Sequence, residues 1–162
     1  LLSVEAQDMV KQKLLPMAML ITPNLPEMEA LTELPLSTYE EKEKAAKYLL
    51  DGGAKAILLK GGHEEGDIKT DILFTPSANG IQSSLFSSES IPTRNIHGTG
   101  CTLSSAITAY LARGHKLEEA ITAAKKFITE AIRSGSDIEI GQGFGPVNHG
   151  FNPLKMQVYV NP

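Results

Sequence analysis

The residues with the clearest capacity for chemistry form the segment HGTGC, residues 97–101, which holds the only cysteine of this 162-residue chain. Gly98 and Gly100 carry no side chains, so a ligand can come close to the backbone here. The apolar spacing that follows predicts a helix, and the first turn of a helix leaves several N–H groups without intrahelical partners. Those donors and the positive helix end favour an anion. The segment is therefore a candidate cradle for a phosphate or an oxyanion.

Cys101 is expected in the first turn of this helix. The positive helix end favours the thiolate, which can accept a proton or attack an electrophile, whereas a phosphate bound nearby would oppose it. The alternative is that the glycines only make a tight loop and that Cys101 packs as a small buried hydrophobe. The chain has neither the G-x-x-x-x-G-K-[ST] pattern of a P-loop nor the G-x-S-x-G pattern of many hydrolases, which disfavours both classes.

Three further residues are candidates for binding a phosphate or its metal ion. Asn24 and Glu27 follow a predicted strand, where they could meet a divalent cation directly or through water. Equally, Asn24 could be a turn residue and Glu27 a residue that favours a helix N-terminus. Lys60 ends another predicted strand and could pair with phosphate oxygens, although a solvated lysine is the commoner case. The four histidines show no metal-ligand spacing, so no structural zinc is expected.

The composition excludes several classes of partner. A net charge of −4 provides no basic surface for nucleic acid. The apolar runs are far shorter than the ~20 residues of a membrane span, and no signal segment is recognised. A single cysteine cannot form an internal disulfide, which suits a reducing compartment. We therefore expect a cytoplasmic protein that binds neither nucleic acid nor membrane.

The expected elements alternate between helices and strands. Residues 1–15 predict a helix with Ser3 as N-cap and Pro16 as its end, followed by a fully apolar strand at 17–21. Ser37 and Glu40 fit a capping box at the start of a longer helix. The remaining expected elements are helices at 27–34, 37–51, 99–113 and 117–135, a buried strand at 55–59, extended runs at 70–74 and 80–86 around an Asn-Gly turn, and a short extended run at 91–95.

This alternation argues for an α/β fold in which helices cover both faces of a parallel sheet. The hairpin around the Asn-Gly turn is expected as an antiparallel insert at one edge of that sheet. Two clear parallel strands are few for three substantial helices, and the chain opens on a helix. We therefore expect the second part of an α/β domain.

Four segments together resemble the hydroxymethylpyrimidine/phosphomethylpyrimidine kinases of thiamine biosynthesis, which are ribokinase-like enzymes. These segments are ITPNLPEMEAL, LLKGGH, HGTGCTLSSAI and GFGPVNH, and they follow the order and spacing of the family over nearly the whole chain. The cysteine of HGTGC is informative, because most ribokinase-like kinases carry aspartate there. The resemblance implies part of a three-layer α/β/α domain with a mainly parallel sheet and an antiparallel edge hairpin.

The resemblance implies an ATP-dependent kinase. Its small-molecule substrates would be 4-amino-5-hydroxymethyl-2-methylpyrimidine and the monophosphate of that pyrimidine, with Mg²⁺ accompanying the nucleotide. In this family the position of Cys101 is that of the base that activates the substrate hydroxyl. The residues that match the anion hole of the family are Gly98, Thr99 and Gly100.

The resemblance also assigns roles to the residues near the two predicted strands. Asn24 and Glu27 match an Asn-x-x-Glu motif that organises Mg²⁺ and phosphate, with contact to the metal expected to be indirect. Lys60 matches a lysine near the nucleotide phosphates. These roles agree with the demands of phosphoryl transfer, which needs mainly positioning and charge stabilisation.

This sequence departs from the family at its start. Family members begin with a strand and a glycine-rich stretch that help to hold the pyrimidine, and neither is present here. We therefore expect residues 1–162 to be the C-terminal portion of a single ribokinase-like kinase domain, lacking the N-terminal strands and the substrate pocket. The full-length form is expected to be a homo-oligomer. A natural short form, and fusion to another thiamine-pathway domain, are left open by the sequence.

Three rival functions remain. A pyridoxal kinase of the same cysteine-bearing branch shares these motifs, so only its substrates distinguish it. A catalytically silent fragment would bind nucleotide but transfer no phosphate until an N-terminal half is supplied. A thiol-dependent hydrolase is disfavoured because neither His63 nor His97 lies in a recognisable nucleophile–base motif.

Overall fold

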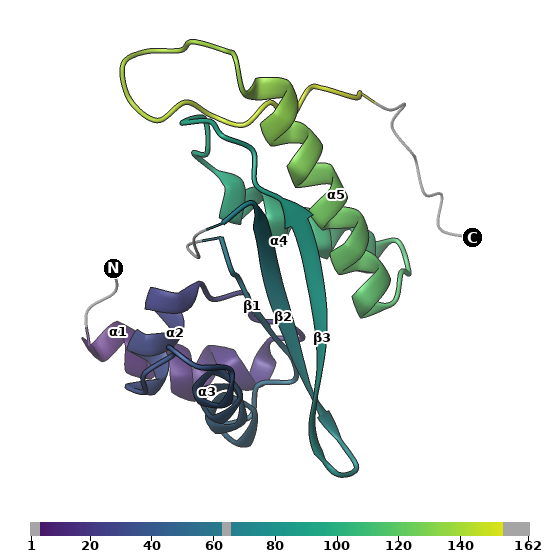
Figure 1. Cartoon of the computed structure of the whole chain (residues 1–162). Coiled ribbons are helices and arrows are strands. Elements are labelled where there is room, and N and C mark those ends of the chain that lie inside the picture. The colour runs from purple at the N-terminus through teal and green to yellow at the C-terminus, as the bar shows by residue number, and fades with distance from the viewer. Residues whose placement is uncertain (1–3, 63–65, 154–162) are drawn as a thin grey trace. The chain divides into compact units, whose positions relative to one another are not determined.

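A computed structural model describes residues 4–62 and 66–153 of the chain (Figure 1). The chain divides into two compact units, Leu1–Ser90 and Ile91–Pro162. Among the described residues, the first unit contains three α-helices and a three-stranded sheet, and the second contains two α-helices and irregular segments. The fold class is α/β, as the sequence predicts. Within the described residues, no helix is both long enough and apolar enough to cross a bilayer.

The first unit opens with a helix that changes pitch along its length. Helix α1, Val4–Met9, continues as a π-helical turn, Val10–Leu14, and as a 3₁₀ turn, Leu15–Met17. The predicted helix is thus present over the described part of residues 1–15, and it runs through Pro16 rather than ending before it. Pro16 lies within the last turn, where its missing N–H costs little. The predicted N-cap, Ser3, lies outside the described residues.

The strand predicted at residues 17–21 is not formed. Helical hydrogen bonding extends to Ala18, whose N–H lies 3.0 Å from the carbonyl oxygen of Leu14, so too few residues remain for a strand. Ile21 alone pairs with Ile57, in a parallel bridge. Met17 and Met19 are exposed, with 77% and 57% of their surface accessible. Apolar composition here therefore does not indicate a segment buried on both faces.

Capping boxes begin the next two helices. Helix α2 covers Leu25–Thr32 and starts at Asn24, where an Asn24–Glu27 box satisfies backbone N–H groups. Helix α3 covers Tyr39–Asp51 and starts at Thr38, whose side chain accepts from the N–H of Glu41. The predicted box of Ser37 and Glu40 is wrong by one residue. Both backbone N–H groups before the helix, at 37 and 38, donate to the Glu41 carboxylate.

The sheet of the described residues is antiparallel. Strands β1 (Ile57–Leu59), β2 (Ile68–Ser77) and β3 (Gly80–Glu89) lie in the order β1-β2-β3, and β2 and β3 form the long hairpin in Figure 1. The hairpin is confirmed, with Ala78 and Asn79 as its loop and Gly80, at φ +119°, already paired with Ser77. The mainly parallel character expected of the sheet is limited in the described residues to the bridges Ile21–Ile57 and Asn24–Lys60. The extended run expected at 91–95 forms no strand.

The core of the first unit lies between its helices and β1 and β2. All three residues of β1 are buried, as expected for a short apolar strand. Met28 of α2, Leu49 of α3 and Phe74 of β2 are each at most 1% exposed and belong to the same cluster. This apolar cluster fixes the ends of β1 and the start of α2, where three of the predicted site residues lie.

The second unit is built on two helices that lie side by side (Figure 1). Helix α4 covers Thr99–Ala112, and α5 covers Leu117–Gly135. Gly114 follows α4 with φ +88°, as expected for a helix terminator. The predicted apolar stripe of α5 is confirmed, since its buried residues include Ala120, Ile121, Ala124, Ile128 and Ala131. The segment after α5 is irregular, as its glycine and proline content predicts.

The position of the N-cap of α3 can be tested with single substitutions. We expect Thr38→Ala to lower the free energy of unfolding by about 1 kcal/mol, because an N–H group of the first turn loses its acceptor. Ser37→Ala is the matched control and should change it by less than about 0.5 kcal/mol. Chemical denaturation measures both variants. A larger loss of unfolding free energy for Ser37→Ala than for Thr38→Ala would instead support the capping box of Ser37 and Glu40 predicted from the sequence.

Candidate active site

The N-terminus of α4 begins in a way that differs from α2 and α3. Its N-cap is Gly98, which adopts a left-handed backbone with φ +85° and supplies no side-chain cap. A Cβ atom at this position would meet no atom within 4 Å, so the glycine is needed for its backbone angle and not for lack of space. The first turn of α4 is therefore open to a ligand.

Two backbone donors are free at this turn. The N–H groups of Gly100 and Cys101 have no hydrogen-bond partner within the part of the chain that the structure describes. Thr99 differs, because its N–H and its hydroxyl both donate to the carbonyl oxygen of Ile96, at 3.2 and 2.6 Å. Thr99 thus closes the turn, while the next two residues offer donors to an anion.

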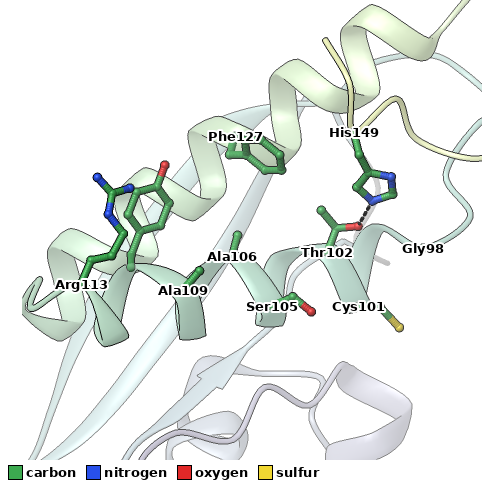
Figure 2. A pocket seen from close by; sticks show the side chains of 10 residues that line it. Gly98, Cys101, Thr102, Ser105, Ala106, Ala109, Arg113, Phe127 and His149 are labelled. Carbon is green, nitrogen blue, oxygen red and sulfur yellow. Dashed lines mark hydrogen bonds between the residues drawn. The ribbon is translucent and has the colours of Figure 1, made fainter. Parts of the chain in front are cut away.

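Cys101 lies at the surface of this turn. Its side chain is exposed, and Figure 2 shows the sulfur directed away from α5. The alternative prediction, that Cys101 packs as a small buried hydrophobe, is therefore wrong. An exposed thiol beside free backbone donors is positioned to meet a bound substrate.

A groove of about 560 Å³ runs along one face of α4 (Figure 2). Gly98, Cys101 and Thr102 lie at one end of it, and Tyr110 and Arg113 lie at the other. Small side chains from α4 and the ring of Phe127 from α5 provide its apolar wall; the small side chains are Ser105, Ala106 and Ala109. The groove therefore joins the anion-binding turn to a surface suited to a flat ring.

His149 connects the irregular C-terminal segment to this groove. Its Nε2 lies 2.7 Å from the hydroxyl oxygen of Thr102, a buried residue in the first turn of α4 (Figure 2). His149 ends the GFGPVNH motif, in which the sequence indicates no partner for it. Only the fold, which returns the segment to α4 after 46 intervening residues, shows the contact.

The first unit brings together the other three predicted site residues. Asn24 Oδ1 accepts from the N–H of Glu27 at 2.8 Å, and Glu27 Oε2 accepts from the N–H of Asn24 at 2.7 Å. Lys60 pairs with Asn24 in a parallel bridge, and its Nζ lies 3.6 Å from Glu27 Oε2. The three residues thus form one cluster, in which Asn24 and Glu27 have the helix-capping role that the sequence left open.

A buried carboxylate that the sequence analysis missed supports this cluster. Asp71 of β2 is 5% exposed and accepts from the N–H of Gly61 at 2.9 Å, directly after Lys60. It holds the start of the Lys-Gly-Gly turn. An aspartate directly before the apolar run of residues 72–74 was the available signal, because buried acids in strands normally have a specific partner.

Mg²⁺ fits this cluster only with help from a substrate. Within the described residues, no group of three or more His, Cys, Asp or Glu side chains can hold a metal ion. Glu27 Oε2 is already shared by a backbone N–H and the Lys60 ammonium group, while the side chain stays 44% exposed. Mg²⁺ commonly keeps several waters and uses one or two carboxylates together with substrate phosphates. Glu27 therefore suits an ion bound through water and phosphate oxygens.

Comparison with known proteins places the chain in a kinase family. Residues 1–148 match the family model described as phosphomethylpyrimidine kinase. The chain is 42% identical, over 92% of its length, to a hydroxymethylpyrimidine/phosphomethylpyrimidine kinase of Staphylococcus aureus, of which it covers 52%. It is 46% identical, over 89% of its length, to the thiamine biosynthesis bifunctional protein ThiED of Geobacter sulfurreducens, of which it covers 28%. The chain thus spans about half or less of the length of these relatives.

A solved structure confirms the fold. The Bacillus subtilis pyridoxal kinase, determined as an ADP complex, matches 92% of the chain with a TM-score of 0.81 and 35% identity, and the chain covers 56% of it. The α/β fold is therefore ribokinase-like, as the motifs predict.

The two ends of α4 provide a matched test of the anion-binding turn. Gly98→Ala and Gly114→Ala both place a Cβ on a left-handed backbone in open space, so each should cost about 1–2 kcal/mol of stability. Only Gly98→Ala disturbs the free donors, and we expect it to weaken binding of a nonhydrolysable ATP analogue about tenfold, while Gly114→Ala leaves the affinity unchanged. Calorimetric titration of the complete gene product measures both. Equal losses of affinity for the ATP analogue would contradict the assignment.

Proposed function

The chain belongs to the phosphomethylpyrimidine kinase family, and from that premise we propose that it acts in the ATP-dependent phosphorylation of 4-amino-5-hydroxymethyl-2-methylpyrimidine and of its monophosphate in thiamine biosynthesis. The observation that carries the proposal is the first turn of α4, where two free backbone donors adjoin an exposed cysteine. The names of the relatives, hydroxymethylpyrimidine/phosphomethylpyrimidine kinase and a thiamine biosynthesis protein, support this choice of substrate.

The cradle at α4 acts on the phosphoryl group that is transferred. Its oxygens carry negative charge throughout the reaction, and the transition state spreads that charge over the equatorial oxygens. The N–H groups of Gly100 and Cys101 are held by the helix before the substrate arrives, so they stabilise this charge without reorganising. Gly98 supplies the backbone angle, and Thr99 closes the turn through Ile96.

The groove along α4 receives the ring of the nucleotide. It begins at the same residues as the cradle, so a nucleotide with its phosphates at the first turn can lay its base against the apolar wall. Phe127 offers a ring face for stacking, and His149, tied to Thr102, closes the groove near the phosphate end. The ADP complex of the similar pyridoxal kinase supports nucleotide binding by this fold.

The resemblance to the family implies that the cluster in the first unit binds nucleotide phosphate, and the chemistry of its side chains suits that role. Lys60 contributes a positive group, and its side chain is mostly buried, with 18% exposed. Glu27, oriented by its capping bonds with Asn24, would hold Mg²⁺ indirectly, through water. When bound, Mg²⁺ neutralises phosphate charge and orients the phosphates for in-line transfer.

Cys101 takes the proton of the substrate hydroxyl. As the hydroxyl oxygen attacks the terminal phosphorus of ATP, its proton passes to the thiolate form of Cys101, which becomes a thiol, and ADP leaves with the electrons of the broken P–O bond. The cytoplasmic location expected from the composition and the homo-oligomeric state expected of the full-length form stay predictions.

The role of Cys101 is tested by a single substitution. We expect Cys101→Ser to lower kcat about 100-fold, because a serine hydroxyl cannot accept the proton at neutral pH, while KM for both substrates changes by less than about threefold. Steady-state kinetics on the complete gene product measures both constants, and the melting temperature checks folding. A kcat equal to that of the unaltered protein would remove Cys101 from the reaction.

A second candidate, pyridoxal kinase, is favoured by the structural match to the B. subtilis enzyme. A substrate panel separates the two, because both reactions phosphorylate a hydroxymethyl group on an aromatic ring. We expect kcat/KM for the hydroxymethylpyrimidine to exceed that for pyridoxal by at least about tenfold. The reverse ratio would assign the chain to pyridoxal. Nucleotide binding without transfer to either acceptor would favour the silent alternative.

A further inference from the structure

Asn95 is a buried polar residue just before the anion-binding turn. Only 3% of its surface is exposed, although it lies in an irregular segment and not in a helix or strand. A buried side-chain amide needs specific partners to offset the loss of water. Its partners show what holds the start of α4 in place.

The amide nitrogen of Asn95 donates to the last residue of α5 and to residues directly after it. Its Nδ2 lies 2.7 Å from the carbonyl oxygen of Gly135 and 2.6 Å from that of Ile138, with the carbonyl of Ser136 at 3.4 Å. These groups can only accept hydrogen bonds, so the side chain between them must be a donor. Aspartate, of nearly the same shape, would instead present a negative charge to carbonyl oxygens.

The opposite side of the Asn95 amide lies against Gly145. A Cβ atom on Gly145 would come within 2.0 Å of Asn95 Oδ1, so only glycine fits there while Asn95 keeps its position. The following residue pairs tie the same two segments together. His97 N–H donates to the carbonyl of Gly145 at 3.0 Å, and Val147 N–H donates to the carbonyl of His97 at 3.3 Å.

The residues after Asn95 connect these bonds directly to the cradle. The carbonyl of Ile96 accepts from both the N–H and the hydroxyl of Thr99, and Gly98 is the N-cap of α4. Each residue from 96 to 99 thus has either a backbone contact or a defined place in the turn that leads to the free donors of Gly100 and Cys101. A shift of Asn95 moves the turn.

We propose that Asn95 is a positioning residue for phosphoryl transfer, whose amide fixes the anion cradle by joining residues 95–97 to the end of α5 and to Gly145. This inference rests on the proposed kinase function. Its consequence is that the geometry of the cradle depends on bonds made some 40 residues away in sequence.

The test uses two independent ways to disturb the same contact in the complete gene product. Asn95→Asp removes the donor, and Gly145→Ala forces the amide to move. The matched controls are Asn79→Asp in the exposed hairpin loop and Gly143→Ala, where a Cβ meets no atom within 4 Å. Melting temperature and circular dichroism identify the conditions in which all four variants are folded.

Two readouts are then compared. Hydrogen–deuterium exchange of a peptide covering residues 96–102 should be about tenfold faster in Asn95→Asp and Gly145→Ala than in the controls. Their kcat should fall roughly 10- to 100-fold with KM for the pyrimidine changed less than about threefold, as expected when a transition-state contact is misplaced. If the melting temperature falls while neither the exchange rate nor kcat changes, Asn95 has only a structural role, and the proposal is overturned.

The two hypotheses fail in distinguishable ways. If the unaltered protein phosphorylates neither acceptor, the proposed function fails, and the exchange rates alone decide whether Asn95 fixes the cradle. If the unaltered protein is active, faster exchange with unchanged kcat in Asn95→Asp would overturn the positioning role. Unchanged exchange in both Asn95→Asp and Gly145→Ala would overturn it in either case.

Discussion

The site depends on the way α4 begins. A capping side chain accepts from the N–H of the third helical residue, as Asn24 does for Glu27 in α2 and Thr38 does for Glu41 in α3. Helix α4 starts at Gly98, which provides a left-handed backbone and no capping atom, so two N–H groups stay available. Free donors at the positive end of a helix attract negative charge, and phosphate is the anion that the family transfers.

Other parts of the second unit contact the residues that surround this turn. Helix α5 buries its apolar stripe, and its C-terminal carbonyl groups receive the amide of Asn95. The irregular segment that follows returns to pair with His97 and places His149 on Thr102. A segment without regular secondary structure thus contributes much of the order near the site, because its backbone groups are satisfied by the residues before α4.

The predictions from sequence were most accurate where the signal is local. Gly98 and Gly114 mark both ends of α4, and the apolar spacing of α5 is recovered because a helix needs only its own period to bury one face. The capping box of α3 was placed one residue early, since Ser37 and Thr38 are equally good caps and each has a glutamate three residues later. The prediction of a strand at 17–21 is wrong because the preceding helix extends to Met17.

What the sequence could not show is set by long-range partners. Asn95 looks like an ordinary loop residue until Gly135, Ile138 and Gly145 are brought to it. Asp71 and Gly61 are separated by ten residues and a turn, and His149 and Thr102 by a whole helix. Such contacts follow from the fold and not from residue type or spacing, so the motifs could not reveal the residues that support the predicted site.

The most direct test of the central claim is a crystal structure of the complete gene product with Mg²⁺ and a nonhydrolysable ATP analogue. The account predicts that the terminal phosphate lies at the first turn of α4, with its oxygens about 3 Å from the backbone nitrogens of Gly100 and Cys101. A terminal phosphate bound elsewhere, with those two N–H groups facing solvent, would contradict it.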